Sequence, residues 1–352
     1  MSLQVFTCEP GWETALTDEL GRVFPASSCR SIAPGWIERR PSDEPPGEPP
    51  CIAFAAQMLP DAGAMSAPSI AKWAQQAGAW LIEGLKRHEG PWRLHVFAVA
   101  GPQASVGQAR CRLIEAALFE LLRKKQRRLL RTCVTDHERP WAADEALVQI
   151  GLLTPADGFC SVVLGQQRAR LRRSLSRFAG GVVEIPSDSA APSRAFAKLA
   201  EVEIRLGRRI AAGEACVDLG SSPGSWAYLA LNRGARVTAV DRSPLRDDLM
   251  AHPRLSFVRG DAFRYEPSET VDWLLCDVIA FPVRSFELLQ TWLQRGWCRW
   301  FCVTLKFKGA GDYPQLENFK SWLTASGAEF YLRRLTSNKN EVMAFGRVNA
   351  EG

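Results

Sequence analysis

The stretch VDLGSSPGSW, residues 217–226, decides the fold class of this 352-residue chain. It begins inside an apolar run, residues 215–219, that predicts a strand, and it leads into a helix predicted over 226–232. Gly220 and Gly224 allow the backbone of this turn to approach a ligand closely. The glycine spacing differs from the dinucleotide motif GxGxxG, and no P-loop lysine follows. We therefore expect a ligand site of another kind at this strand-to-helix crossover.

Strands and helices alternate through the rest of the C-terminal half. Such alternation predicts a mostly parallel sheet with helices on both faces. We therefore assign residues 194–352 to an α/β domain of the Rossmann type. The predicted helices span residues 194–209, 226–232, 285–295 and 315–326, and the predicted strands span 215–219, 236–240, 255–259, 273–276, 301–305 and 341–346.

The first half of the chain has a pattern that is typical of a small α+β region, which we assign to residues 1–183. A division of this region into two subdomains, 1–75 and 76–183, is one option. Proline and serine are frequent at 184–193, which predicts a linker, and the polar, proline-rich residues 41–50 predict a surface loop. A helix is predicted over 109–131, in which Leu113, Ala116, Ala117, Leu121 and Leu122 recur at helical spacing. The other elements are strands at 3–7 and 93–99, a helix at 12–23, and apolar runs at 51–56, 148–153 and 159–164.

Acidic residues end two of the strands that follow the glycine-rich turn. Asp241 closes the next strand, roughly twenty residues further on, where a carboxylate can accept hydrogen bonds from ribose hydroxyls. Asp261 ends the third strand, where a carboxylate can face an adenine amine. Together with the turn, the two residues fit S-adenosylmethionine (SAM) better than NAD. The alternative is that both are ordinary turn residues after strands.

Four further ionisable residues occur in the order Lys198, Asp277, Lys306 and Glu341. Lys198 lies in the helix before the first strand, and the other three lie at strand ends, where open α/β sheets place their ligands. A ribose 2′-hydroxyl must lose its proton as it attacks an electrophilic methyl group. An amine that is partly desolvated beside a second lysine can accept that proton, and nearby carboxylates would orient the two amines. Each residue alone is better explained as a solvated surface side chain, so the hypothesis depends on the combination.

These residues resemble the FtsJ-type RNA ribose 2′-O-methyltransferases, which combine a DLGxxPGGW cofactor loop with a Lys-Asp-Lys-Glu tetrad. The segment APSRAFAKL, residues 191–199, is similar in particular to the start of the catalytic domain in the RlmM-type family. Members of that family methylate a cytidine 2′-hydroxyl of bacterial 23S rRNA and carry an N-terminal THUMP RNA-binding region. The segments WLQRGWC (292–298) and PGWE (10–13) resemble the same family. The resemblance extends over nearly the whole chain and is strongest after residue 190.

The resemblance implies roles for particular residues. Lys198 would accept the proton, with Asp277, Lys306 and Glu341 as its partners, and residues 1–183 would form a THUMP-like RNA-binding region. Ser225 departs from the family, whose loop usually has glycine there, and this affects how closely the backbone approaches the cofactor. The residues that would line the SAM site are Asp218, Gly220, Ser221, Pro223, Gly224, Ser225, Trp226, Asp241, Asp261 and Asp277.

The net charge of +6 is unevenly distributed along the chain. Residues 1–90 carry −4, residues 91–180 carry +8 and residues 181–352 carry +2. Clusters of basic residues neutralise phosphates, so this middle region predicts contact with RNA. Part of a basic helix can equally be a solvated face. The predicted RNA-binding residues are Arg123, Lys124, Lys125, Arg127, Arg128, Arg131, Arg168, Arg170, Arg172 and Arg173.

Composition excludes several classes of protein. A hydrophobic fraction of 46% with 23% charged residues is typical of a globular protein and not of a disordered one. No apolar stretch is long enough to span a bilayer, and the first residues lack the pattern of a signal peptide. The ten cysteines have neither zinc-ligand spacing nor the pattern of a secreted disulfide scaffold. Cys276 and Cys302 are predicted to be core thiols and not nucleophiles.

We therefore expect a cytoplasmic enzyme, without a metal, that transfers a methyl group from SAM to a ribose 2′-hydroxyl of RNA. The expected substrate is 23S rRNA, either naked or in a large-subunit precursor, and the expected state is a monomer or weak oligomer. Two alternatives stay open. One is a SAM enzyme that acts on a base or on another RNA class, and the other is a non-catalytic RNA-binding protein with a vestigial methyltransferase fold.

Overall fold

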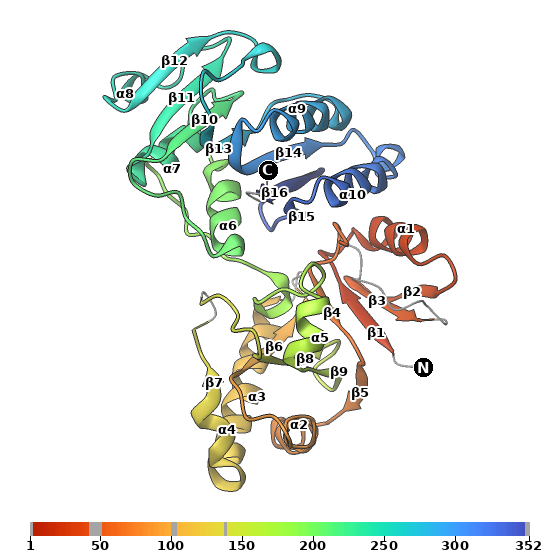
Figure 1. Cartoon of the computed structure of the whole chain (residues 1–352). Coiled ribbons are helices and arrows are strands. Elements are labelled where there is room, and N and C mark those ends of the chain that lie inside the picture. Colours follow the sequence, from red (N-terminus) through yellow and green to blue (C-terminus); the bar gives the residue numbers. More distant parts are fainter. Residues whose placement is uncertain (1–2, 42–50, 100–103, 137–138, 349–352) are drawn as a thin grey trace. The chain divides into compact units, whose positions relative to one another are not determined.

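The computed structural model describes residues 3–41, 51–99, 104–136 and 139–348 (Figure 1). The chain divides into two compact units, Met1–Val182 and Val183–Gly352, which are described separately. The linker predicted at 184–193 follows this division directly and contains neither helix nor strand. The surface loop predicted at 41–50 lies outside the described residues, except for Pro41.

The first unit begins with a four-stranded antiparallel sheet and one helix. The elements are β1 (Gln4–Thr7), α1 (Glu13–Val23), β2 (Ser28–Ala33), β3 (Trp36–Arg40) and β4 (Gln57–Leu59), and the strand order is β2-β3-β1-β4. The buried carboxylate of Glu19 on α1 accepts hydrogen bonds from the backbone nitrogens of Ala53 and Phe54, at 2.7 and 3.0 Å. The apolar run at 51–56 is therefore a buried segment without regular structure that α1 holds in place.

A second sheet of five strands follows in the same unit. Its strands are β5 (Gly63–Ser66), β6 (Trp92–Ala98), β7 (Cys133–Val134), β8 (Ala146–Leu152) and β9 (Asp157–Val163), in the order β5-β9-β8-β6-β7. Its helices are α2 (Ile70–Gly84), α3 (Ala104–Lys125), α4 (Arg127–Thr132), α5 (Gly165–Arg170) and the short η1 (Ala179–Gly181). The division considered at residue 75 is wrong, because α2 runs through that position and packs with this sheet in one hydrophobic core.

The helix predicted over 109–131 is in fact two helices. It breaks at Gln126, whose φ of −147° and ψ of 59° are not helical, so α3 ends at Lys125 and α4 begins at Arg127. The buried face also differs from the prediction, since Leu113 is 55% exposed. The residues of α3 that enter the core are Cys111, Ile114, Leu118 and Leu122, which share a face at spacings of three and four residues.

The second unit is built on a seven-stranded sheet. Its strands are β10 (Ala215–Leu219), β11 (Arg236–Asp241), β12 (Leu255–Arg259), β13 (Val271–Cys276), β14 (Cys298–Lys306), β15 (Glu329–Arg333) and β16 (Glu341–Arg347). The order is β12-β11-β10-β13-β14-β16-β15, with parallel pairing from β12 through β14 and antiparallel pairing on both sides of β16. The predicted α/β fold class and mostly parallel sheet are thus confirmed. The sequence reading missed β15, an edge strand in which only three apolar residues stand between charged ones.

Helices lie on both faces of this sheet (Figure 1). They are α6 (Phe196–Leu206), α7 (Ser225–Asn232), α8 (Asp247–Met250), α9 (Pro282–Gln294) and α10 (Gln315–Ala325), with short turns η2 (Ala262–Arg264) and η3 (Ala310–Asp312). Strand side chains alternate between faces, so Trp273 and Leu275 pack with α6 and α7 in one core. On the other face α9 contacts β14, and Phe286 of α9 stacks on Phe319 of α10 with ring centroids 4.1 Å apart.

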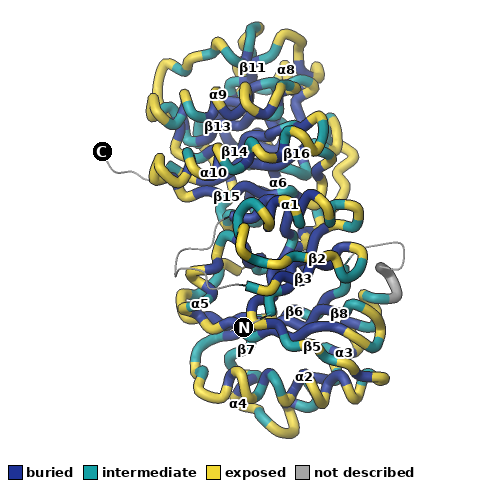
Figure 2. Tube along the Cα trace, turned by 90° about the vertical axis from the view of Figure 1, so that its right-hand side faces the viewer, coloured by how far each residue is buried: buried dark blue, intermediate teal, exposed yellow. Residues whose placement is uncertain are grey.

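Burial follows the same layering, because the strands are mostly buried and exposed residues gather on helix surfaces and connections (Figure 2). All ten cysteines lie in the described ranges and are free thiols. Cys276 and Cys302 are fully buried, which confirms their prediction as core residues, and burial raises the pKa of the Cys276 thiol to about 12. Among the described residues, no helix is long and apolar enough to cross a membrane.

Candidate functional site

The glycine-rich turn has a backbone that only glycine adopts easily. Gly220 follows β10 with φ +72°, and a Cβ there would lie 2.6 Å from Cγ1 and 3.0 Å from Cα of Val278. Gly224 precedes α7 with φ +108°, and a Cβ would lie 2.4 Å from Cδ1 of Leu249. Both the positive φ and the close neighbours therefore require glycine at these two positions.

A cavity of about 540 Å³ opens beside this turn at the carboxyl ends of the parallel strands. Its volume is in the range of small-molecule and cofactor sites. Ser221 is buried against it, and its Oγ has no hydrogen-bond partner among the described residues, so it is available to a ligand. Of the residues predicted for a SAM site, those that line the cavity are Asp218, Gly220, Ser221, Pro223, Ser225, Trp226, Asp241, Asp261 and Asp277.

Three carboxyl groups of the cavity have different environments. Asp218 is fully buried, and desolvation raises the pKa of its carboxyl to about 8, although it accepts a 3.0 Å hydrogen bond from the nitrogen of Ala227. Each carboxylate oxygen of Asp241 accepts one backbone N–H, from Ser222 at 3.1 Å and from Ser243 at 2.9 Å.

The third carboxyl group, that of Asp261, is partly exposed at the rim. It accepts a hydrogen bond from the nitrogen of Phe263 and pairs with Arg242 at 2.9 Å. The hydrogen bond and the ion pair lower the pKa of Asp261, against a raising effect of desolvation. Each of these carboxyl groups is oriented by the backbone and keeps lone pairs for further donors.

The four residues Lys198, Asp277, Lys306 and Glu341 come together at the end of the sheet where β13 and β14 finish. Nζ of Lys198 lies 2.7 Å from Oε1 of Glu341 and 3.3 Å from Oδ2 of Asp277. Nζ of Lys306 lies 3.0 Å from Oδ1 of Asp277 and donates to the backbone oxygen of that residue at 2.9 Å. The carboxylate of Asp277 thus lies between the two lysines, and Asp277 and Lys306 line the cavity.

The fold explains why residues far apart in the sequence meet here. Lys306 ends β14 and Glu341 begins β16, and the antiparallel register of these strands places them opposite each other. Asp277 follows β13, which pairs with β14, and Lys198 lies on α6. Sequence reasoning did not single out Asn338, whose Nδ2 donates to Oε1 of Glu341 at 3.0 Å and so orients that carboxylate. The amide lies three residues before Glu341, but nothing in the local pattern marks it.

Ser225, where the family usually has glycine, makes a specific contact. Its Oγ lies 2.7 Å from Oγ of Ser193, and Nε1 of Trp226 donates to the backbone oxygen of Ala195 at 2.9 Å. These two contacts join the start of α7 to the segment just before α6, and α6 is the helix that carries Lys198. The serine is therefore accommodated without closing the cavity, which it lines.

The predicted RNA-binding residues of the first unit do not form one uniform surface. Arg123, Lys124, Lys125, Arg127, Arg128, Arg131, Arg170 and Arg172 are exposed, and Arg173 is half-buried. The prediction for Arg168 is corrected, because this residue is only 5% exposed. Its guanidinium donates to the backbone oxygens of Ala142, Ala143 and Glu145, at 2.6 to 3.0 Å, and burial lowers its pKa.

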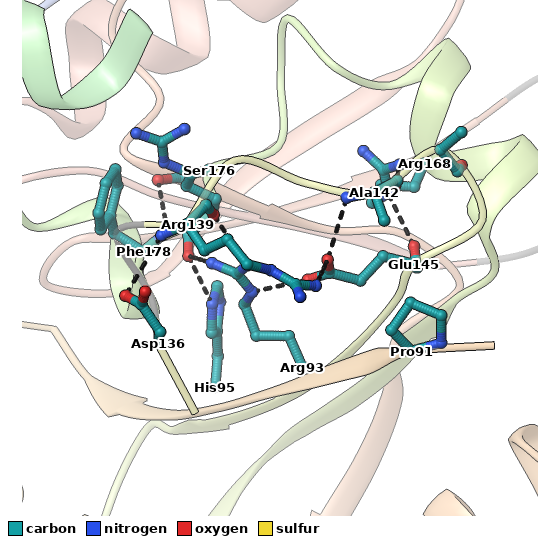
Figure 3. A network of polar contacts seen from close by, with 12 residues as sticks. Pro91, Arg93, His95, Asp136, Arg139, Ala142, Glu145, Arg168, Ser176 and Phe178 are labelled. Atoms are coloured by element: carbon teal, nitrogen blue, oxygen red, sulfur yellow. Dashed lines mark hydrogen bonds and ion pairs between the residues drawn. The ribbon is translucent and has the colours of Figure 1, made fainter. Parts of the chain in front are cut away.

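Arg168 belongs to a buried polar network in that unit (Figure 3). Its centre is the ion pair between Nε of Arg93 and Oε1 of Glu145, 2.8 Å apart, with both side chains fully buried. Arg139 pairs with the other oxygen of Glu145 at 3.1 Å, and Nε2 of His95 lies 2.9 Å from the backbone oxygen of Arg177. The network joins the segment around Arg177 to the sheet, so its arginines serve the structure of the unit.

No group of three or more His, Cys, Asp or Glu residues that could hold a metal ion occurs in the part of the chain that the structure describes. The candidate site consists of the glycine turn, the acidic strand ends and the lysine–carboxylate cluster. In a sheet of this order, these features define a methyltransferase domain of the Rossmann type.

Comparison with known proteins agrees and is more specific. The FtsJ-like methyltransferase family matches residues 191–313. A ribosomal RNA large subunit methyltransferase M from Alkalilimnicola ehrlichii is 30% identical over 333 residues, which cover 84% of each chain. One from Thauera aminoaromatica is 36% identical over 176 residues, or 47% of this chain and 48% of that relative. The chain therefore belongs to the ribosomal RNA large subunit methyltransferase M family.

The alignment spans about half the length of the first relatives, with 48%, 49% and 51% of their chains covered. Among solved structures, TrmN from Thermus thermophilus is similar at 15% identity and a TM-score of 0.33, over 99% of this chain and all of that one. A similarity this low carries no functional argument.

Proposed function

We propose that this protein transfers a methyl group from SAM to a ribose 2′-hydroxyl of RNA. The proposed substrate is large-subunit (23S) rRNA, with a cytidine as the target nucleotide. The observation that carries the proposal is the amine of Lys198, held by Asp277 and Glu341 next to the cavity that Asp277 and Lys306 line. Membership of the large subunit methyltransferase M family supports the RNA class, and the cluster supports a hydroxyl as the acceptor.

The residues of the cavity fit SAM, which would supply an electrophilic methyl group when bound. Each oxygen of Asp241 already accepts one backbone N–H and has a lone pair left for a ribose hydroxyl. Asp261 has the same capacity at the rim, where an adenine amine would lie. The hydroxyl of Ser221 is buried without a partner among the described residues, so a polar group of the cofactor would satisfy it.

The cluster can carry out the proton transfer that the reaction needs. In its neutral form, Nζ of Lys198 would accept the proton of the ribose hydroxyl as that oxygen takes the methyl group and the sulfur–methyl bond of SAM breaks, which leaves the demethylated thioether. The ammonium that results is stabilised by the carboxylates of Asp277 and Glu341, at 3.3 and 2.7 Å. Lys306 neutralises the second oxygen of Asp277. A positioned base such as Lys198 typically contributes about 10²- to 10⁴-fold in rate.

The first unit is proposed to hold the RNA as a THUMP-like region. Its exposed basic residues, above all those of α3, α4 and α5, can neutralise phosphates and make binding depend on salt. Arg168 is not among them, because its guanidinium is engaged by backbone oxygens.

Nucleoside analysis tests the reaction. The full-length protein is incubated with methyl-labelled SAM and 23S rRNA, naked or in a large-subunit precursor, and the RNA is digested to nucleosides. Label on 2′-O-methylcytidine is expected. Label on a base would contradict the proposed acceptor, and absence of both transfer and SAM binding in a calorimetric titration would indicate a vestigial fold. The Lys198→Ala variant should bind SAM normally and transfer the label about 10²- to 10⁴-fold more slowly; near-normal transfer would remove Lys198 from the mechanism.

A further inference from the structure

Three large apolar side chains, at every second position of one short stretch of sequence, are exposed next to the cavity. Ile279, 95% exposed, and Phe281, 57% exposed, lie in the segment that connects β13 to α9, and Val283, 42% exposed, lies in the first turn of α9. Ile279 also lines the cavity. Single exposed apolar residues are common, but a group of them at the rim of a site indicates a binding surface.

Cations lie directly on two aromatic rings, one in the lining of the cavity and one in the chain segments that continue from it. Nζ of Lys308 is 4.2 Å from the ring centroid of Phe281, and Cζ of Arg284 is 3.9 Å from the ring centroid of Phe263. Arg284 and Phe263 line the cavity, and Arg284 and Lys308 are exposed. Aromatic rings that stack on bases, together with cations that pair with phosphates, are the combination that binds unpaired nucleotides. A duplex would not present its base faces, and an apolar protein partner would not use the cations.

The backbone places these side chains close to the reacting group. Phe281 follows Asp277 by four residues, so their Cα atoms are at most about 14 Å apart. Lys308 follows Lys306 by two residues. Both segments continue outward from the ends of neighbouring parallel strands, so they approach the same substrate from two sides.

We propose that Phe281 and Lys308 form a stacking platform for an unpaired RNA base next to the target ribose. The base lies on the exposed part of the Phe281 side chain, and Lys308, which supports one face of the ring, pairs with a phosphate of the same strand. Both are positioning residues, because they hold the nucleotide while the proton transfer occurs at Lys198. The inference rests on the proposed function and deepens it by naming how the substrate strand is held.

The test measures RNA affinity and catalysis in the Phe281→Ala variant of the full-length protein. Loss of one stacked base is expected to weaken binding of transcribed 23S rRNA about 5- to 150-fold, with a matching rise in KM for RNA. Affinity for SAM should stay within a factor of about two, because Phe281 does not line the cavity. Phe281→Trp should restore RNA binding to near the wild-type value, which a loss of folding would not allow. Met250→Ala, another exposed apolar residue of the same unit, is the matched control.

Lys308→Ala tests the cation separately. It should weaken RNA binding and reduce the slope of log affinity against log salt by about one. The control is Arg236→Ala, which removes an exposed cation at the first residue of β11, at the opposite end of the parallel strands from the cavity, and should leave both quantities unchanged. Unchanged RNA affinity in Phe281→Ala, or an effect on self-association in sedimentation instead, would overturn the platform. If the wild-type protein binds RNA but forms no 2′-O-methyl nucleoside, the proposed function fails, and the binding measurements still decide on the platform.

Discussion

Replacement of Lys198 should separate the chemical role of the amine from its role in holding two carboxylates. The side chain is only 11% exposed, and that of Glu341 only 9%. Lys198→Met leaves Glu341 with the Asn338 amide but without the cation that lies 2.7 Å away. Removal of one partner of a buried ion pair typically costs about 3–5 kcal/mol, so we expect a loss near the lower value for this slightly exposed pair.

Two companion variants divide this effect. Lys198→Arg keeps a cation between the carboxylates, so its stability should remain within about 1 kcal/mol of the wild type, but an arginine stays protonated and cannot act as the base. The double variant Lys198→Met with Glu341→Gln removes the unpaired charge and should recover most of the stability. All three variants should lose about 10²- to 10⁴-fold in the rate of methyl transfer.

The assay combines single-turnover methyl transfer with hydrogen exchange of the α6 and β16 peptides in increasing urea, which reports on the second unit separately from the first. Activity of Lys198→Arg above about one tenth of the wild-type value would refute the assignment of Lys198 as the base. Unchanged protection of α6 and β16 in Lys198→Met would refute the energetic importance of the ion pair.

Three further outcomes are expected. Gly220→Ala introduces a Cβ 2.6 Å from Val278 at a φ of +72°, so it should destabilise the second unit by more than about 1 kcal/mol and abolish SAM binding, as measured by urea unfolding and titration calorimetry; normal binding would contradict the close approach. Because burial raises the pKa of Asp218 to about 8 in the fold, its neutral form stabilises the protein at low pH, and this contribution is lost as pH rises from about 4 to 8. Asp218→Asn should therefore gain stability relative to the wild type across that range, and urea midpoints with a constant difference between pH 5 and pH 8 would contradict the shift. In the first unit, Arg168→Ala should lower the melting temperature, whereas Arg170→Ala should leave it unchanged and weaken RNA binding at low salt; the reverse pattern would place Arg168 at the RNA.

The sequence by itself predicted the mostly parallel sheet of the second unit and the end of that sheet at which the candidate site lies. Parallel strands end at one edge of a sheet, so Asp241, Asp261, Asp277 and Lys306 could be assigned to that edge from strand patterns alone. The glycine turn was equally readable, because a positive φ and a close backbone contact leave glycine as the fitting residue.

Only the tertiary structure decided which side chains meet and which are buried. Arg168 looked like its neighbours in a basic run, but the carbonyl groups that bind it belong to residues 142–145, more than twenty positions away. The contact of Phe281 with Lys308 likewise joins two segments that are distant in the sequence. The break at Gln126 and the Asn338 contact with Glu341 are local in the sequence, but no residue pattern marks them. Local patterns specify where a residue lies on an element, because backbone periodicity is local. Burial and partners come from contacts between distant segments, which the periodicity does not encode.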